Sequence, residues 1–400
     1  MEGGKATVVL IALLAFAGWP ACRPADDFGS NHQGDDDDTS DDDDSTEIEV
    51  DSGGPGRFTA IDTDVHNAAH IVHYTLFWHH DDPATTVGQL RYATNGGAQW
   101  ATGEVDTDGD WGAQTVVVLD GEDDLHVSFF RDGAPAYAFR DNLSWSTETV
   151  DPATKLRDVA GVTSLDVGPA DEIHLSYFDG EDLFYARPGE EGWTIEVVDA
   201  LGSGYGDHAL AVDSAGTVHI VYYDAGDAVL RHAARDGDGW TVEVVDDDGD
   251  VGRHASLALD SDDQLHVAYR DATGDAIRYA HGTTGDWSTA LVDDDGRPGG
   301  WCTGIDVGSD GAVHLSYYAD DEGDLRHATN ASGSWEVTPI DIAGDVGRYS
   351  SIAVDLHGEI HIAYQAWKAD EGEGALKYAS NLTGFWEIEL VEDVGDLDRE

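Results

Sequence analysis

One supersecondary unit recurs seven times along this chain, and that repetition limits the fold more than any other feature. A histidine in the pattern apolar-His-apolar-small-aromatic returns at intervals of 45 to 48 residues after a first interval of 56, and a tryptophan returns in step with it. Two markers with the same spacing and the same count indicate seven copies of one unit. The markers are His70, His126, His174, His219, His266, His314 and His361, with Trp100, Trp145, Trp193, Trp240, Trp287, Trp335 and Trp386.

A single copy contains four short strand-like segments, clearest at 256–260, 265–270, 277–280 and 287–292. Each is rich in β-branched, aromatic or aliphatic residues, and turns containing Gly or Asp separate them, which is typical of a hairpin meander. No segment keeps a 3.6-residue period, so helix should be nearly absent. Seven meanders of this length predict an all-β chain that folds into a seven-bladed β-propeller with four antiparallel strands per blade.

The repeated histidine and tryptophan are predicted to be structural, because seven equivalent positions around a ring cannot all belong to one active site. We expect the histidine to hydrogen-bond a neighbouring turn and the tryptophan to pack at the blade edge. The segment Glu47–Asp51 resembles the end of a fourth strand and could close the ring. It competes for that place with the segment 386–392 of the last repeat, and both possibilities stay open.

Charge narrows the possible partners. The chain has 82 acidic and 20 basic residues, a formal net charge of −62. Such a chain repels nucleic acid and anionic membrane surfaces, so a membrane is expected as a partner only through a lipid anchor.

The N-terminus predicts export. Residues 1–22 read as a signal peptide, with Lys5 before a short apolar run and Cys22 as a possible lipidation site. Cleavage near Ala21 and a retained anchor are the alternatives. Residues 23–46 form an Asp-rich segment that is expected to be a disordered tether to the propeller at 47–393, and 394–400 form a short tail. Cys302 is either a lone thiol or the partner of Cys22 in a disulfide.

Two loops depart from the repeat. The connection between the second and third strands is longest in blades 1 and 7, which become neighbours when the ring closes. These insertions carry Trp78 and His79 in one and Trp367 in the other, and long loops on a rigid scaffold often carry function. Ordinary loop variation is the alternative. His79 lies beside His80, Asp81 and Asp82, which could together ligate a metal.

The start of the first strand supplies a second group of candidates. Arg57, Arg253 and Arg348 occupy one register there, thirteen residues before the repeated histidine, and Trp301 holds the same place in blade 6. They are predicted to face the central axis as ligand contacts, with structural ion pairs to acidic loops as the alternative. Asp62, Asp166 and Asp306 share another register, where they could bind a cation, orient a polar ligand or brace a turn.

The turns before the fourth strand carry a family resemblance. Ser380–Trp386 and Thr329–Trp335 resemble degenerate Asp-box, or BNR, repeats of secreted bacterial sialidase-like propellers; both lack the aspartate of that pattern. The resemblance implies a propeller over about residues 55 to 393. It also implies a possible glycoside hydrolase in which Arg57, Arg253 and Arg348 would hold a substrate carboxylate, because sialidases use three arginines in this way.

The regularity of the repeats favours binding over catalysis, because no blade stands out with a nucleophile and an acid. We therefore expect a surface-displayed module that binds a glycan or an extracellular protein. A sialidase-like hydrolase and a structural envelope protein without a small ligand are the alternatives. No cofactor is predicted; calcium is a secondary possibility at the alternating Asp106, Asp108 and Asp110, which lack the later glutamate of an EF-hand.

Overall fold

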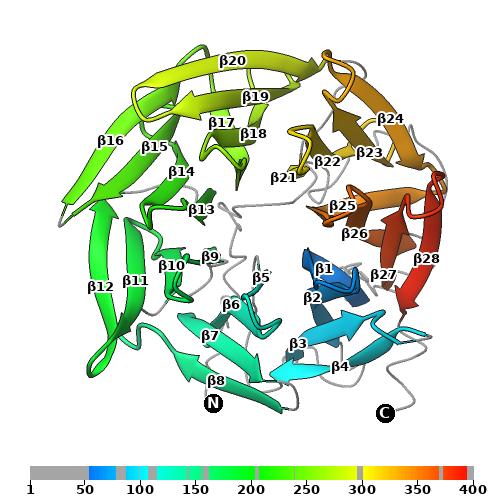
Figure 1. The fold of residues 1–400 in the computed structure, drawn as a ribbon, viewed down its shortest axis with the longest axis horizontal. Helices are drawn as coiled ribbons and strands as arrows, with labels where there is room; N and C mark the ends of the chain where they lie inside the picture. Colours follow the sequence, from blue (N-terminus) through cyan, green and yellow to red (C-terminus); the bar gives the residue numbers. More distant parts are fainter. Residues whose placement is uncertain are drawn as a thin grey trace, which may run out of the picture.

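The computed structural model describes residues 54–77, 87–97, 99–106, 115–141, 144–154, 156, 162–202, 207–237, 239–294, 301–368 and 373–393. These residues form 28 strands in seven separate four-stranded antiparallel sheets, arranged as blades around a central axis (Figure 1). The predicted seven-bladed propeller is confirmed. The described residues contain no helix that could cross a membrane.

Each blade takes four consecutive strands, in the order first, second, third and fourth from the axis outward. Blades 1 to 3 consist of β1 Gly54–Thr63, β2 Ala69–Phe77, β3 Val87–Thr94, β4 Ala101–Asp106; β5 Val116–Leu119, β6 Leu125–Arg131, β7 Ala134–Asp141, β8 Ser144–Thr149; and β9 Thr163–Val167, β10 Ile173–Phe178, β11 Leu183–Gly189, β12 Gly192–Asp199. Blades 4 to 7 consist of β13 His208–Val212, β14 Val218–Asp224, β15 Val229–Asp236, β16 Gly239–Asp246; β17 Val251–Leu259, β18 Leu265–Asp271, β19 Ala276–Thr283, β20 Asp286–Asp293; β21 Trp301–Val307, β22 Val313–Ala319, β23 Asp324–Thr329, β24 Glu336–Asp341; and β25 Asp345–Val354, β26 Ile360–Lys368, β27 Glu373–Ser380, β28 Glu387–Glu392.

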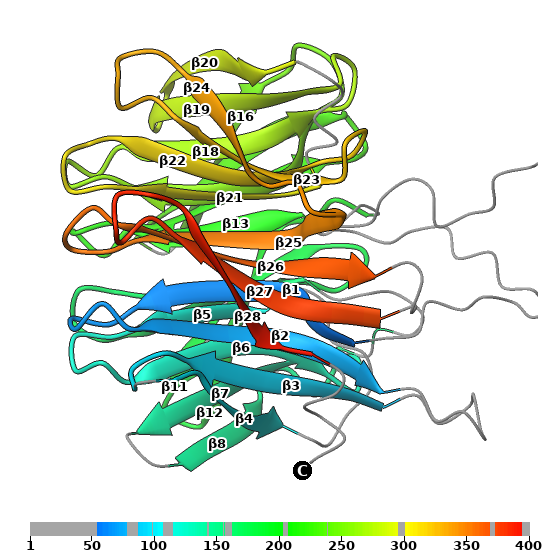
Figure 2. The same cartoon turned by 90° about the vertical axis from the view of Figure 1, so that its right-hand side faces the viewer.

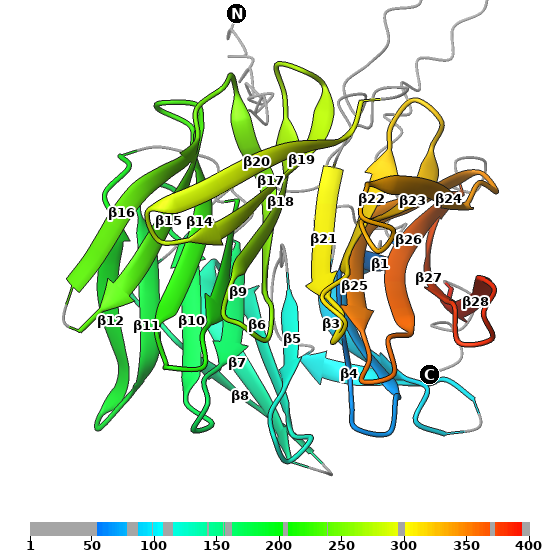
Figure 3. The same cartoon turned by 45° about the horizontal axis from the view of Figure 1, so that its top comes forward.

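The second strand of each blade is buried almost from end to end, as in β10, β14 and β22. It lies between two strands of its own sheet and between the two neighbouring blades, so both of its faces are covered. The fourth strands form the outer edge of the ring. The packed blades together make a short cylinder, which Figure 2 shows from the side and Figure 3 shows tilted.

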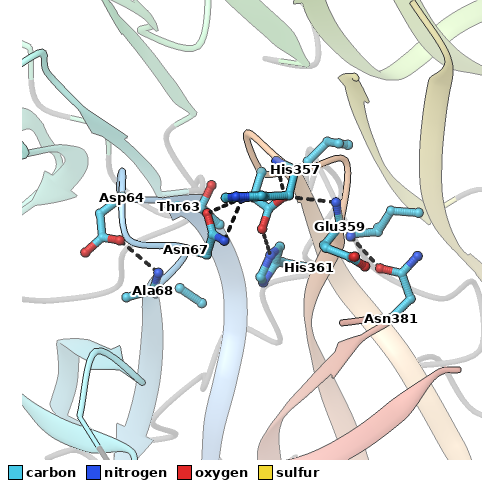
Figure 4. Close-up of polar contacts among 12 residues, drawn as sticks. Thr63, Asp64, Asn67, Ala68, His357, Glu359, His361 and Asn381 are labelled. Carbon is cyan, nitrogen blue, oxygen red and sulfur yellow. Dashed lines mark hydrogen bonds and ion pairs between the residues drawn. The ribbon is translucent and has the colours of Figure 1, made fainter. Parts of the chain in front are cut away.

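The repeated histidine braces the turn between the first two strands of its own blade, as predicted. In five blades its Nε2 lies 3.1–3.4 Å from the aspartate that opens this turn. The same aspartate accepts two backbone N–H groups of the turn, as Asp355 does from His357 and Glu359. Figure 4 shows this arrangement where blades 1 and 7 meet, with His357 and Asn67 2.8 Å apart across the joint.

The repeated tryptophan joins each blade to the one before it. Its ring meets the edge or tilted face of an aromatic ring on the third strand of the preceding blade, with centroids 5.0–5.6 Å apart. Such pairs add stability beyond their buried area. The series includes Trp100 of blade 1 on Tyr378 of blade 7, so it runs unbroken around the ring.

A polar clamp accompanies most of these joints. The aspartate that ends the fourth strand accepts a tyrosine hydroxyl from the second strand of the next blade, as in Tyr269 to Asp246 at 2.6 Å. A cation on the next blade's third strand pairs with the same carboxylate, as Arg278 does at 3.2 Å. Similar bonds join Tyr317 to Asp293 and Tyr364 to Asp341.

The joint between blades 7 and 1 uses different residues at these places. Arg91 binds Glu392 through three contacts of 2.7–3.1 Å, and His73 lies 3.3 Å from the same carboxylate. All three side chains are buried. β28 holds the fourth place of blade 7, so that sheet is built from C-terminal residues alone. The competing segment Glu47–Asp51 lies outside the described residues.

Candidate functional site

Three blades begin their first strand with the same distorted turn, Gly-Arg followed by an aromatic residue. In blades 1, 5 and 7 these are Arg57–Phe58, Arg253–His254 and Arg348–Tyr349, and each strand has a β-bulge at this point. The aromatic residues have φ of 51°, 54° and 55°, which bulky side chains rarely adopt. Bulges redirect side chains and are frequent beside functional sites. These bulges set the direction of the three arginines at the start of the innermost strands of blades 1, 5 and 7.

Neighbouring blades hold this strained backbone in place. The carbonyl oxygen of each left-handed residue accepts a threonine hydroxyl from the next blade's first strand: Thr115 to Phe58, Thr303 to His254 and Thr59 to Tyr349. The glycine before the arginine is required in blades 5 and 7. A Cβ at Gly252 would lie 2.8 Å from the Cα of Leu230, and a Cβ at Gly347 would lie 2.7 Å from the Cα of Leu325. Strain of this kind persists only where its surroundings fix it.

Two of the arginines form ion pairs with an aspartate three residues earlier in the chain. Arg253 binds Asp250 through contacts of 3.2 and 2.8 Å, and Arg348 binds Asp345 through contacts of 3.0 and 2.6 Å. A tyrosine of the preceding blade completes each cluster, because Tyr223 donates to Asp250 and Tyr318 to Asp345. Each guanidinium also lies over the ring of that tyrosine. The ion-pair alternative for Arg253 and Arg348 is therefore what the structure contains.

Arg57 is buried at the joint between blades 7 and 1. Its Nη2 donates to the hydroxyl of Tyr349 at 3.3 Å, and its guanidinium lies 5.8 Å from the centre of that ring. Arg57 and Arg348 thus lie on either side of Tyr349, while Arg253 lies two blades from Arg348. Each guanidinium is oriented by a protein partner of its own, so the arrangement differs from the shared carboxylate clamp that the resemblance implied.

Trp367 is the aromatic candidate that lies beside one of these clusters. It is half-buried near the end of β26, and its backbone pairs with Asp345, the partner of Arg348. We call Tyr318, Asp345, Arg348 and Trp367 the blade 7 rim. Trp301 starts β21, but its side chain lies outside the described residues, as do Trp78, His79 and the adjacent possible metal ligands. In the described part of the chain, no three metal-ligating side chains group together.

The tyrosines of the inter-blade clamps are poor candidates for a nucleophile. Burial and a hydrogen bond to a carboxylate both raise the pKa of Tyr177, Tyr222 and Tyr269 well above its ordinary value. A nucleophilic phenol needs the opposite shift, toward the ionised form. These hydroxyls act as donors that join blades.

The aspartates of the second register join neighbouring blades instead of bracing a turn. Asp62, Asp166 and Asp306 each accept the N–H of the following residue and a second N–H from the first strand of the next blade, at 2.7–2.8 Å. Burial raises the pKa of Asp62 to about 7, and the charges of Asp306 and Asp166 add to this shift. Burial also raises the pKa of Asp166 and Asp306 to about 6.

The sequence predicts ion pairs with acidic loops such as 246–250, but Asp250 and Asp345 were not singled out as the partners. Asp250 and Asp345 precede Arg253 and Arg348 in an identical Asp-Val-Gly-Arg segment, which is the signal that could have revealed both ion pairs. Asp106, considered for calcium, instead binds Arg131 of blade 2 at 3.0 Å, and Asp108 and Asp110 lie outside the described residues.

Comparison with known proteins supports the fold. No family model and no curated protein matches the chain. The structure is similar to a protein of unknown function from Dyadobacter fermentans, with 12% identity over 83% of this chain and 95% of that one and a TM-score of 0.50. An intramolecular trans-sialidase from Ruminococcus gnavus is 13% identical over 77% of this chain and 89% of that one, with a TM-score of 0.41. An α-L-arabinanase from Penicillium chrysogenum is 14% identical over 62% of this chain and 87% of that one, with a TM-score of 0.45. At 12% identity, the likeness to the Dyadobacter protein concerns the fold alone.

Proposed function

We propose that this chain is an exported propeller that binds a glycan or an extracellular protein at the blade 7 rim and catalyses no reaction. The supporting observation is the pairing of Trp367 with Asp345 beside the Arg348 guanidinium. A carboxylate that accepts and a guanidinium that donates, both fixed in position, suit the hydroxyls of a sugar or the polar groups of a peptide. An indole next to them adds apolar contact area, which is the usual composition of a binding site.

Blade 5 shows what distinguishes this rim. Asp250, Arg253 and Tyr223 reproduce the polar part of the cluster, but Ala272 takes the place of Trp367 six residues after the repeated histidine. If the polar cluster served only to hold the bulge, blade 7 would not need the tryptophan. The difference between the two blades therefore supports binding at blade 7.

The residues that the structure describes give hydrolysis less support. A sialidase-like reaction needs a tyrosine–glutamate pair with an acid beside the arginines. The hydroxyls of the clamp tyrosines are hydrogen-bonded to aspartates of neighbouring blades, and the arginines are separately oriented. Binding is therefore the better proposal.

The test compares the wild type with W367A on a glycan array and, for any ligand found, by titration. W367A places in blade 7 the residue that blade 5 carries naturally, so the fold should be kept. We expect affinity to fall at least tenfold in W367A and R348A, and to stay unchanged in the matched control R253A. Equal affinity in all four proteins would contradict the proposal. Hydrolysis of a fluorogenic sialoside that R348A abolishes would favour the enzyme instead.

Export and tethering are part of the same proposal, and they are tested separately. Metabolic labelling with a palmitate analogue should mark the wild type and not Cys22→Ser. Label and membrane association retained in that variant would contradict lipidation at Cys22.

A further inference from the structure

Two blades carry a histidine where the other five have a tyrosine. On the third strand, a tyrosine hydroxyl lies 2.6 Å from Nδ1 of the repeated histidine in blades 1, 2, 3, 5 and 7. In blade 4 this partner is His232, 3.0 Å from His219, and in blade 6 it is His327, 3.1 Å from His314. Trp287 and Trp386 of the next blades pack directly on these two histidines.

The pair in blade 4 has a carboxylate at each end. Nε2 of His219 lies 3.4 Å from Asp213, and Nδ1 of His232 lies 2.9 Å from Glu243. The chain Asp213–His219–His232–Glu243 therefore has three contacts that each need a proton. Two neutral imidazoles carry one N–H each and supply only two. A third proton would complete every contact, so this pair can accept charge where it lies.

The pair in blade 6 lacks both carboxylates. Gly308 stands where blade 4 has Asp213, and Thr338 lies opposite His327 in the ladder, where Glu243 lies opposite His232. His327 faces His314 from β22, Thr338 from β24 and Trp386, which directly precedes β28. Asp310 in the turn acts on His314 through charge. Among the described residues, no carboxylate forms an ion pair with either imidazole of this pair, so a proton added there would be a buried charge without a partner.

We infer that the joint between blades 6 and 7 is acid-labile: protonation of the His314–His327 pair separates Trp386 from blade 6, whereas the pair in blade 4 takes up a proton with its joint intact. Burial, together with the charge of His314, lowers the pKa of His327 to about 3. Burial also lowers the pKa of His232 to about 4, although Glu243 opposes that shift.

The sign of the effect follows from the lowered pKa. In the open joint the imidazole returns to the ordinary pKa of about 6.5, so opening binds a proton. The closed joint is fully favoured above pH 6.5, and this preference is lost as the pH falls toward the closed-state pKa. Between pH 7.5 and 4.5 the opening equilibrium should rise ~100-fold, because it grows about tenfold for each pH unit below the ordinary pKa.

The same joint carries the blade 7 rim at its other end. β22 contributes both His314 and Tyr318, and Tyr318 donates to Asp345 of blade 7. Opening would therefore disturb the rim, a consequence that rests on the proposed function. The acid-labile joint itself does not depend on any ligand.

Hydrogen exchange of the full chain tests the joint directly. Protection of β23, β24 and β28 is measured at pH 7.5 and 4.5 and corrected for the intrinsic exchange rate. The joint between blades 3 and 4 is the internal reference, because it differs from the blade 6–7 joint in having a tyrosine as the partner of the repeated histidine. Tyr185 contacts His174 and packs against Trp240 of blade 4. Like blade 6, blade 3 has a glycine, Gly168, in place of the turn aspartate. We expect the blade 6–7 joint to lose ~100-fold protection, and the reference joint to lose less.

Two variants identify the cause. H327Y gives blade 6 the pair found in blade 3, and T338E places at an exposed position the carboxylate that Glu243 supplies in blade 4. Both should reduce the acid-induced loss of protection at this joint, because each changes a group that faces the buried imidazoles. An unchanged loss in both variants would overturn the inference, as would equal losses at the reference joint and the blade 6–7 joint in the wild type. That wild-type comparison and T338E remain decisive if H327Y fails to fold.

Discussion

The joint between blades 7 and 1 should depend strongly on Glu392. The chain connects the two blades of each other joint directly, whereas among the described residues this joint is made by contacts between distant parts of the sequence, such as Arg91 and Glu392, which are 301 positions apart. Glu392→Gln keeps the size of the side chain and removes its charge. Arg91, of which 2% is exposed, is then left as a buried cation without its carboxylate.

The expected cost follows from that burial. Removing one partner of a buried ion pair typically destabilises a protein by about 3–5 kcal/mol, because the remaining charge stays desolvated. A domain is typically stable by only about 5–15 kcal/mol, so the change should be large. Urea unfolding followed by circular dichroism at pH 7 measures it as a lower midpoint at unchanged slope.

A matched variant and a double substitution sharpen the test. D293N removes the equivalent carboxylate of Tyr317 and Arg326 at a joint that the chain also connects. The double variant E392D/H73Y rebuilds at this joint the tyrosine–aspartate–arginine clamp of the other joints. Its stability should be close to that of the wild type and well above that of E392Q. A loss below about 1 kcal/mol in E392Q would refute the reasoning, because a buried pair cannot be removed so cheaply.

The same residue gives a pH dependence. Burial alone would raise the pKa of Glu392, but the hydrogen bond and charge of His73, together with Arg91, outweigh it and lower that pKa. A lowered carboxyl pKa contributes stability above its ordinary value of about 4.5, and this contribution is lost as the pH falls below it. The wild type should therefore approach E392Q in stability in acid.

Three further predictions concern single side chains. Ser176→Ala should raise stability by up to about 1 kcal/mol in urea unfolding, because the buried hydroxyl has no hydrogen-bond partner among the described residues and Ala268 and Ala363 occupy the same register. Asp62→Ala should flatten the pH dependence of stability between pH 6 and 8. Because the folded-state pKa of Asp62 is raised to about 7, the wild type loses about 1 kcal/mol of stability over this range as the carboxyl group loses its proton. Thermal unfolding should show no such loss in the variant. Gly347→Ala should cost more than about 1 kcal/mol, because φ is +103° and the new Cβ would meet Leu325, and an unchanged melting temperature would contradict this close approach.

Local repetition allowed most of the architecture to be predicted from the sequence. The spacing of the histidines and tryptophans gave seven blades, and the turn residues gave four strands in each, because these features depend on contacts within one repeat. In blade 5, the predicted segment 265–270 compares with β18 at Leu265–Asp271, and 287–292 with β20 at Asp286–Asp293. The bracing role of the histidine also followed, since its turn lies only six residues away.

Contacts between blades were decided by the tertiary structure. The sequence placed three arginines in one register, but their partners depend on bulges that turn each side chain toward its own aspartate or toward Tyr349. Arg91 and Glu392 meet because the ring closes, and no local pattern links them. A repeat encodes how one blade folds; which side chains meet across a joint depends on the twist and packing of two blades, and the residues that break the repeat acquire their meaning there.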